Sequence, residues 1–110
     1  MSDTQLLSPL DGRYHRVTEP LVEYLSEFAL NRARLRVEVE WLIFLAGSGA
    51  VAELAPLTAA DIEFLRGLPG QFGEKEAAEL AAIEAETRHD VKAVEYFLKA
   101  RLAGTALEPA

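Results

Sequence analysis

The chain has 110 residues, of which 50% are hydrophobic and 26% are charged, and its formal net charge is −7 at pH 7. These proportions are typical of an ordinary globular domain with one core. The acidic balance argues against a nucleic-acid-binding surface, which needs a basic patch, and the absence of cysteine excludes disulfides and thiolate chemistry.

The sequence shows no signal for export or for membrane insertion. The N-terminus lacks a basic region followed by a long apolar run, which a signal peptide needs. No apolar stretch is long enough to span a bilayer. The two histidines, His15 and His89, are too few and too separated to indicate a zinc site. We therefore expect a cytoplasmic protein that binds neither nucleic acid nor a membrane.

Residues 1–17 are expected to form an arm followed by a turn. The pair Asp11-Gly12, close behind a proline, is typical of a turn. Arg13 and Tyr14 leave that turn side by side and allow two interpretations. They form either a surface turn with a packed Tyr14 ring, or a pair of donors for an anionic ligand.

The order of apolar residues, caps and helix breakers predicts about five helices within residues 18–103, followed by a tail at 104–110. The fold class that we expect is all-α, as one small helical domain over residues 1–110 with a structured N-terminal turn. The expected helices are, in order, 18–25 behind a Thr18 cap, 27–46 behind a Ser26 cap, 58–68 with Thr58 and Asp61 as a capping box, 74–87, and a last helix behind Asp90.

The predicted helix at residues 27–46 has two apolar faces at a turn of about 100° per residue. A helix that is apolar on two sides must be covered on two sides, so it is either central or covered partly by further chain. We assign Trp41 to the core. The two faces consist of Leu30, Val37, Trp41 and Phe44, and of Phe28, Leu35, Val39 and Leu42.

The last predicted helix begins behind a polar stretch. Asp90 suits an N-cap, because its carboxylate can accept a hydrogen bond from a free N–H of the first turn. Gly104 fits the stop of the helix. A buried stripe is expected at helical spacing, formed by Val91, Val94, Leu98 and Leu102.

This geometry puts Arg88 and His89 just outside a helix N-terminus. Such a terminus carries partial positive charge and unpaired donors, so it favours anions. An imidazole and a guanidinium there could hold a phosphate or a carboxylate. The alternative interpretation is that both are solvated loop residues, as at many helix starts.

Three segments stand out in order along the chain: Ser-Pro-Leu-Asp-Gly-Arg-Tyr at 8–14, Arg-Val-Glu-Val-Glu-Trp-Leu at 36–42, and Thr-Arg-His-Asp-Val-Lys-Ala-Val-Glu-Tyr-Phe-Leu at 87–98. They resemble, respectively, the N-terminal segment, the first long helix and the first histidine motif of the adenylosuccinate lyase family. Three ordered matches over nearly the whole chain are specific, whereas a lone His-Asp pair is not. The resemblance implies domain 1 of the fumarase and aspartase fold.

The resemblance also implies a chemistry. The family eliminates fumarate from adenylosuccinate, giving AMP, and from SAICAR, giving AICAR, in purine nucleotide biosynthesis, and it requires no cofactor or metal. Elimination needs a base, an acid and clamps for anionic groups. The resemblance implies that His89 lies in the active site as a substrate binder or an acid–base group, and that Asp90 next to it also belongs to the substrate-binding residues. It further implies that Arg13 and Tyr14 contact the purine nucleotide. Arg88 stands where the family varies, which implies a contact through its backbone.

Members of the resembled family are several times longer than this chain. The sequence stops before their second histidine, which is regarded as the general acid, and before the serine loop that supplies the base. It also lacks the long-helix bundle that forms their homotetramer. We therefore expect the 110 residues alone to be inactive as a lyase. Two alternatives are a small non-catalytic helical interaction module and a domain of another lyase of the same superfamily.

Overall fold

The computed structural model describes residues 5–105 and 107–108. Every regular element in these ranges is a helix and none is a strand, which confirms the predicted all-α class. The chain divides into two compact units, Met1–Leu30 and Asn31–Ala110, and the prediction of one domain over the whole chain stays a prediction. The predicted arm and tail fall partly on residues 1–4, 106 and 109–110, which lie outside the described residues. Among the described helices, none combines the length and the apolarity that crossing a membrane requires.

The first unit contains a hydrogen-bonded turn and short helical segments. The Tyr14 N–H donates to the Pro9 carbonyl at 2.9 Å, so the chain is already wound when α1 (His15–Thr18) begins. The elements η2 (Glu19–Leu21) and α2 (Val22–Leu25) follow. The predicted Thr18 cap is wrong, because the Thr18 hydroxyl caps no N–H and its single proton is shared between the carbonyl oxygens of Leu10 and His15, at 3.0 and 3.2 Å.

The long helix α3 (Glu27–Ser48) begins where the sequence predicts. Ser26 caps it, since its Oγ accepts a hydrogen bond from the Ala29 N–H at 3.1 Å. The face with Leu35 and Val39, each 1% exposed, is buried.

The opposite face of α3 is open. Val37, Trp41 and Phe44 are 64%, 55% and 63% exposed, so the assignment of Trp41 to the core is wrong. The physical reason is that the other helices of the second unit cover only one face of α3, and a second apolar face needs another covering layer. The rings of Trp41 and Phe44 stack on each other with centroids 5.7 Å apart.

Helix α4 (Ala59–Gly70) starts with the predicted capping box. The Asp61 N–H donates to the Thr58 Oγ1 at 3.1 Å, and the Thr58 N–H donates to the Asp61 carboxylate at 3.0 Å. The helix continues past the predicted end at Leu68 and includes Pro69. A proline in the last turn removes only one N–H donor, and Gln71 closes the turn by donating to Gly67.

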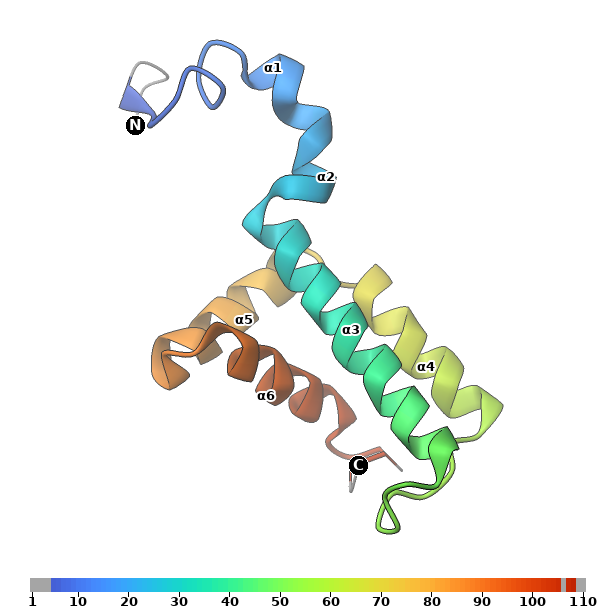
Figure 1. The fold of residues 1–110 in the computed structure, drawn as a ribbon. Helices are drawn as coiled ribbons and strands as arrows, with labels where there is room; N and C mark the ends of the chain where they lie inside the picture. Colours follow the sequence, from blue (N-terminus) through green and yellow to red (C-terminus); the bar gives the residue numbers. More distant parts are fainter. Residues whose placement is uncertain (1–4, 106, 109–110) are drawn as a thin grey trace. The chain divides into compact units, whose positions relative to one another are not determined.

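Helices α5 (Glu74–Thr87) and α6 (Asp90–Leu102) lie side by side as a hairpin (Figure 1). The bounds of α5 agree with the prediction. In α6 the predicted Val91 is 38% exposed, whereas Ala93 and Phe97, absent from the predicted stripe, are buried. The other predicted stripe residues are buried, namely Val94, Leu98 and Leu102. The Phe97 ring packs edge to face on Phe72 with centroids 5.7 Å apart.

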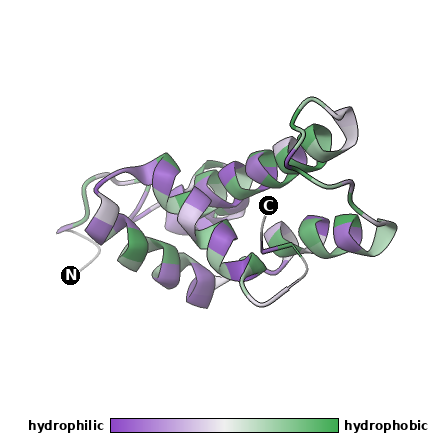
Figure 2. Ribbon diagram, turned by 90° about the horizontal axis from the view of Figure 1, so that it is seen from below, coloured by the Kyte–Doolittle hydropathy of each residue, from purple (hydrophilic) through white to green (hydrophobic). Residues whose placement is uncertain are grey.

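Helices α4, α5 and α6 are amphipathic, whereas α3 carries apolar residues on two sides, and hydrophobic and hydrophilic residues alternate along their ribbons (Figure 2). Their apolar sides supply the core, and no charged or polar residue among the described ones is buried. Besides the residues of α6, the buried large side chains are Leu35, Val39, Leu65, Leu68, Phe72, Leu80 and Leu107.

Candidate functional site

The chain reverses between α5 and α6 in two residues. Arg88 ends α5 in the left-handed conformation, with φ 54° and ψ 31°, and its N–H donates to the Glu84 carbonyl at 2.7 Å. His89 is extended, with φ −145° and ψ 114°. A left-handed residue other than glycine costs about 1–2 kcal/mol. The surrounding contacts must therefore hold this junction in one conformation.

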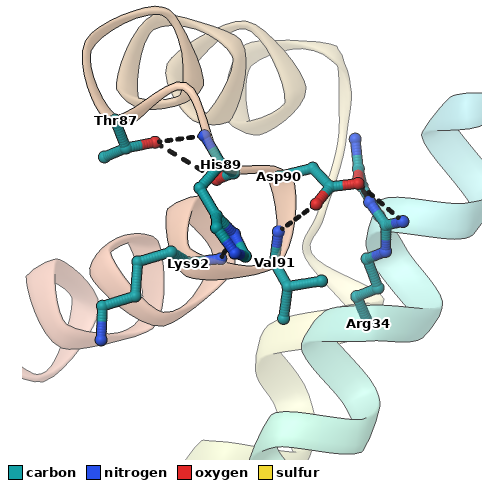
Figure 3. A network of polar contacts seen from close by, with 7 residues as sticks. Arg34, Thr87, His89, Asp90, Val91 and Lys92 are labelled. Carbon is teal, nitrogen blue, oxygen red and sulfur yellow. Dashed lines mark hydrogen bonds and ion pairs between the residues drawn. The ribbon is translucent and has the colours of Figure 1, made fainter.

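His89, not Asp90, is the N-cap of α6. The Lys92 N–H donates to the His89 Nδ1 at 3.2 Å (Figure 3). The prediction of Asp90 as the cap is wrong by one residue, because the cap needs an extended backbone and His89 has it. Asp90 is the first residue of the helix.

The cap determines where the proton of the neutral imidazole lies. A backbone N–H can only donate, so Nδ1 must be the acceptor and carries no proton. The neutral His89 ring therefore holds its proton on Nε2. Because His89 is exposed, the site presents an Nε2–H donor beside a helix N-terminus.

Thr87 fixes the backbone of His89 from the other side. Its hydroxyl accepts a hydrogen bond from the His89 N–H at 3.3 Å and donates to the His89 carbonyl at 3.2 Å (Figure 3). Thr87 was not among the predicted site residues, although a threonine hydroxyl commonly hydrogen-bonds the backbone two residues later.

Asp90 joins the start of α6 to α3. Its Oδ1 accepts a hydrogen bond from the Val91 N–H at 2.8 Å, and its Oδ2 lies 3.1 Å from an Nη of Arg34 (Figure 3). These two contacts, the Val91 N–H first and the Arg34 charge second, hold the pKa of Asp90 below its ordinary value. Arg34 could not be predicted as a partner of Asp90, since no spacing rule connects a residue in one helix with a carboxylate 56 positions later.

Arg88 and Lys92 flank the cap as exposed cations. The Lys92 ammonium pairs with the Glu95 carboxylate at 2.7 Å and lies 5.6 Å from the centroid of the Tyr96 ring. The hydrogen bond from Lys92 to Glu95 raises the pKa of this lysine. Lys92 thus stays charged near the site while its side chain points along α6.

Arg13 and Tyr14 lie in the first unit, at the end of the hydrogen-bonded turn, and both are exposed. The structure brings Arg88, His89 and Asp90 together at the junction of α5 and α6. A site shared by these three residues with Arg13 and Tyr14 stays a prediction from the sequence. Over residues 5–105 and 107–108, no three His, Asp or Glu side chains form a group suited to hold a metal ion.

Several curated proteins are similar to this chain. The adenylosuccinate lyase of Haemophilus influenzae is 45% identical over 102 residues, which are 93% of this chain and 22% of that protein. The enzyme of the same name from Legionella pneumophila is 45% identical over 93 residues, or 84% of this chain and 20% of the relative. The adenylosuccinate lyase of Escherichia coli K12 is 42% identical over 103 residues, which are 94% of this chain and 23% of that protein. No protein-family model matches the chain. The chain spans about a fifth of the length of the relatives it matches.

Proposed function

Because the chain is homologous to about the N-terminal fifth of the adenylosuccinate lyases, we propose that it is the N-terminal domain of such an enzyme. The proposed reaction eliminates fumarate from adenylosuccinate, giving AMP, and from SAICAR, giving AICAR. A cytoplasmic, homotetrameric enzyme of purine nucleotide biosynthesis is part of the same proposal. The observation that carries it is identity of 42–45% over 84–94% of the chain.

His89 is the residue of this domain that we propose to act on the substrate. Its Nδ1 is occupied by the Lys92 N–H, so the ring can donate through Nε2 but cannot accept there in the neutral state. The substrates carry carboxylate and phosphate groups, and a donor at a helix N-terminus is suited to such anions. The geometry therefore supports His89 as a donor to the substrate and not as the base.

The other predicted site residues have supporting roles in this proposal. Asp90 anchors the first turn of α6, and Arg88 contributes the backbone turn that sets the direction of His89. Arg13 and Tyr14 present a guanidinium and a hydroxyl that can bind anionic oxygens of the nucleotide. The base, the general acid and the tetramer contacts are assigned to the rest of the enzyme.

The experiment uses a chimera in which this chain replaces the matching segment of the Escherichia coli relative. His89→Ser keeps an N-cap acceptor but removes the imidazole, so stability should stay within about 0.5 kcal/mol of the parent chimera. Fumarate release from adenylosuccinate should fall by about 100-fold or more, the scale for removing one positioned hydrogen-bond donor from an active site. His89→Ala removes both functions and should also lose about 1 kcal/mol of stability. Near-full activity of the His89→Ser chimera would show that His89 has no role in the reaction.

A further inference from the structure

We propose that Arg34 is a positioning residue, which acts through Asp90 to hold the first turn of α6 and so to aim the imidazole of His89. The inference rests on the proposed function in one respect, namely that His89 contacts the substrate. Its physical part, the control of the His89 ring by Arg34, concerns this chain alone.

The two oxygens of the Asp90 carboxylate contact two different helices, α6 and α3. One oxygen accepts a hydrogen bond from the Val91 N–H in α6, and the other pairs with Arg34 in α3. Arg34 is itself oriented, because its other Nη donates to the Asn31 Oδ1 one turn earlier, at 3.2 Å. The Arg34 side chain is 27% exposed, against 49% for Asp90. A half-buried guanidinium held at two points defines where the carboxylate can lie.

The position of Asp90 then limits the position of His89. The two residues are consecutive, and the backbone of His89 is also bound on its other side by the Thr87 hydroxyl. The ring is bound in turn by the Lys92 N–H. Thr87, Lys92 and the pair of Arg34 with Asp90 thus leave the imidazole little freedom, and Nε2 is the remaining polar atom of the ring (Figure 3).

The pair is not needed to keep α3 and α6 in the fold. Both helices are held by apolar side chains that are at most 7% exposed, among them Leu35, Val39, Val94 and Leu98. An ion pair at this level of exposure contributes little to the free energy of folding. What distinguishes the Arg34–Asp90 pair is its location, because Asp90 directly follows His89, the N-cap whose ring carries the proposed donor.

The first test is NMR spectroscopy on the 110-residue chain. The hydrogen exchange rate of the Lys92 amide and the ring ¹⁵N shifts of His89 report the cap and its tautomer directly. Arg34→Met should remove the protection of the Lys92 amide and mix the tautomers, while the Leu98 amide in the core stays protected. Arg34→Lys keeps a positive charge and should retain part of the Lys92 amide protection and of the single His89 tautomer.

The matched control is Arg66→Met. Arg66 also binds a carboxylate across helices, with its Nε 2.9 Å from an Oε of Glu40 in α3, and neither residue is among the hydrogen-bond partners of the cap. This variant should leave the Lys92 amide and the His89 ring unchanged. Equal Lys92 exchange rates and equal His89 ring ¹⁵N shifts in the Arg34→Met and Arg66→Met chains would overturn the proposal. If Arg34→Met also exposes the Leu98 amide, the variant Asp90→Asn tests the proposal in its place. It removes the charge that pairs with Arg34 and keeps an oxygen acceptor for the Val91 N–H. Unchanged Lys92 protection in Asp90→Asn would overturn the proposal as well.

The second test measures kcat and KM in the chimera with the Escherichia coli relative. Misplacing a reacting group by about 1 Å can cost on the order of 100-fold in rate. Arg34→Met should therefore lower kcat by about 10- to 100-fold with a smaller change in KM, and Arg66→Met should leave both unchanged. A parent chimera without activity would contradict the proposed function, while the NMR comparison would still decide whether Arg34 controls His89. Equal kcat for both variants in an active chimera would refute the positioning role.

Discussion

One imidazole has two roles at the start of α6. The His89 Nδ1 satisfies a backbone donor of the first turn, and its Nε2–H remains for a ligand. A substitution that removes the ring therefore tests structure and chemistry together unless the replacement can still cap. This is why His89→Ser is more informative than His89→Ala.

A cap cannot be assigned from residue types alone when neighbours can both accept hydrogen bonds. His89 and Asp90 are both able to cap, and the choice follows from the left-handed backbone at Arg88. Ser26 and the pair Thr58 and Asp61 could be predicted because each is followed by an uninterrupted helical pattern. Arg34 could not be linked to Asp90, because the contact depends on how α3 packs beside α6.

Glu38 provides a prediction on pH dependence. Partial burial, and second the charge of Glu95, raise the pKa of Glu38 above its ordinary value of 4.5. The protonated form of Glu38 is therefore more favourable in the folded chain than in the unfolded one. Its contribution to the free energy of unfolding is fully present below pH 4.5 and is lost as the pH rises through the raised pKa. Glu38→Gln should stabilise the chain at pH 7 by up to about 0.5 kcal/mol.

The measurement for Glu38 is the urea midpoint of unfolding at pH 7 and again below pH 4.5. The advantage of Glu38→Gln should disappear at the lower pH. A variant that is less stable at pH 7 than the parent would show that the charged carboxylate makes a favourable contact.

At the level of the helices, the sequence pattern predicts the existence and approximate bounds of the four long helices, α3 to α6. Helix α5 agrees at both ends, and α3 and α4 begin where their caps stand. The helix expected at 18–25 begins earlier, at His15, and is divided into α1, η2 and α2. Pro20 lacks an N–H, and the Thr18 hydroxyl donates to the earlier Leu10 carbonyl and does not cap the helix. Periodicity also identified both apolar faces of α3, but it cannot tell which of two equal faces is covered.

The two faces of α3 can be compared with one matched pair of substitutions. Val39 is 1% exposed and Val37 is 64% exposed in the same helix. Val39→Ala should cost on the order of 2 kcal/mol through lost burial and the cavity left behind. Val37→Ala should stay within about 0.5 kcal/mol. Urea unfolding of both variants checks this, and equal losses would mean that the face with Val37 is buried in solution.

At the scale of the whole molecule, we propose that this chain supplies a substrate donor and that the base and the general acid lie in the rest of the enzyme. The base and the general acid of an elimination act as a unit with the binding groups. We therefore predict that the purified 110-residue chain releases no fumarate from adenylosuccinate above the rate in buffer. Release that depends on the chain concentration would show that the described residues hold a complete active site.

We propose above that this chain is the N-terminal domain of an adenylosuccinate lyase. The most direct measurement is fumarate release by the Escherichia coli relative carrying this chain in place of its own matching segment, beside the same enzyme with that segment deleted. Since 42% of the 103 aligned residues are identical, the chimera should keep activity within about tenfold of the parent, equivalent to 1.4 kcal/mol in the barrier. The deletion should be inactive. A chimera that folds and assembles like the parent but releases no more fumarate than the deletion would contradict the claim.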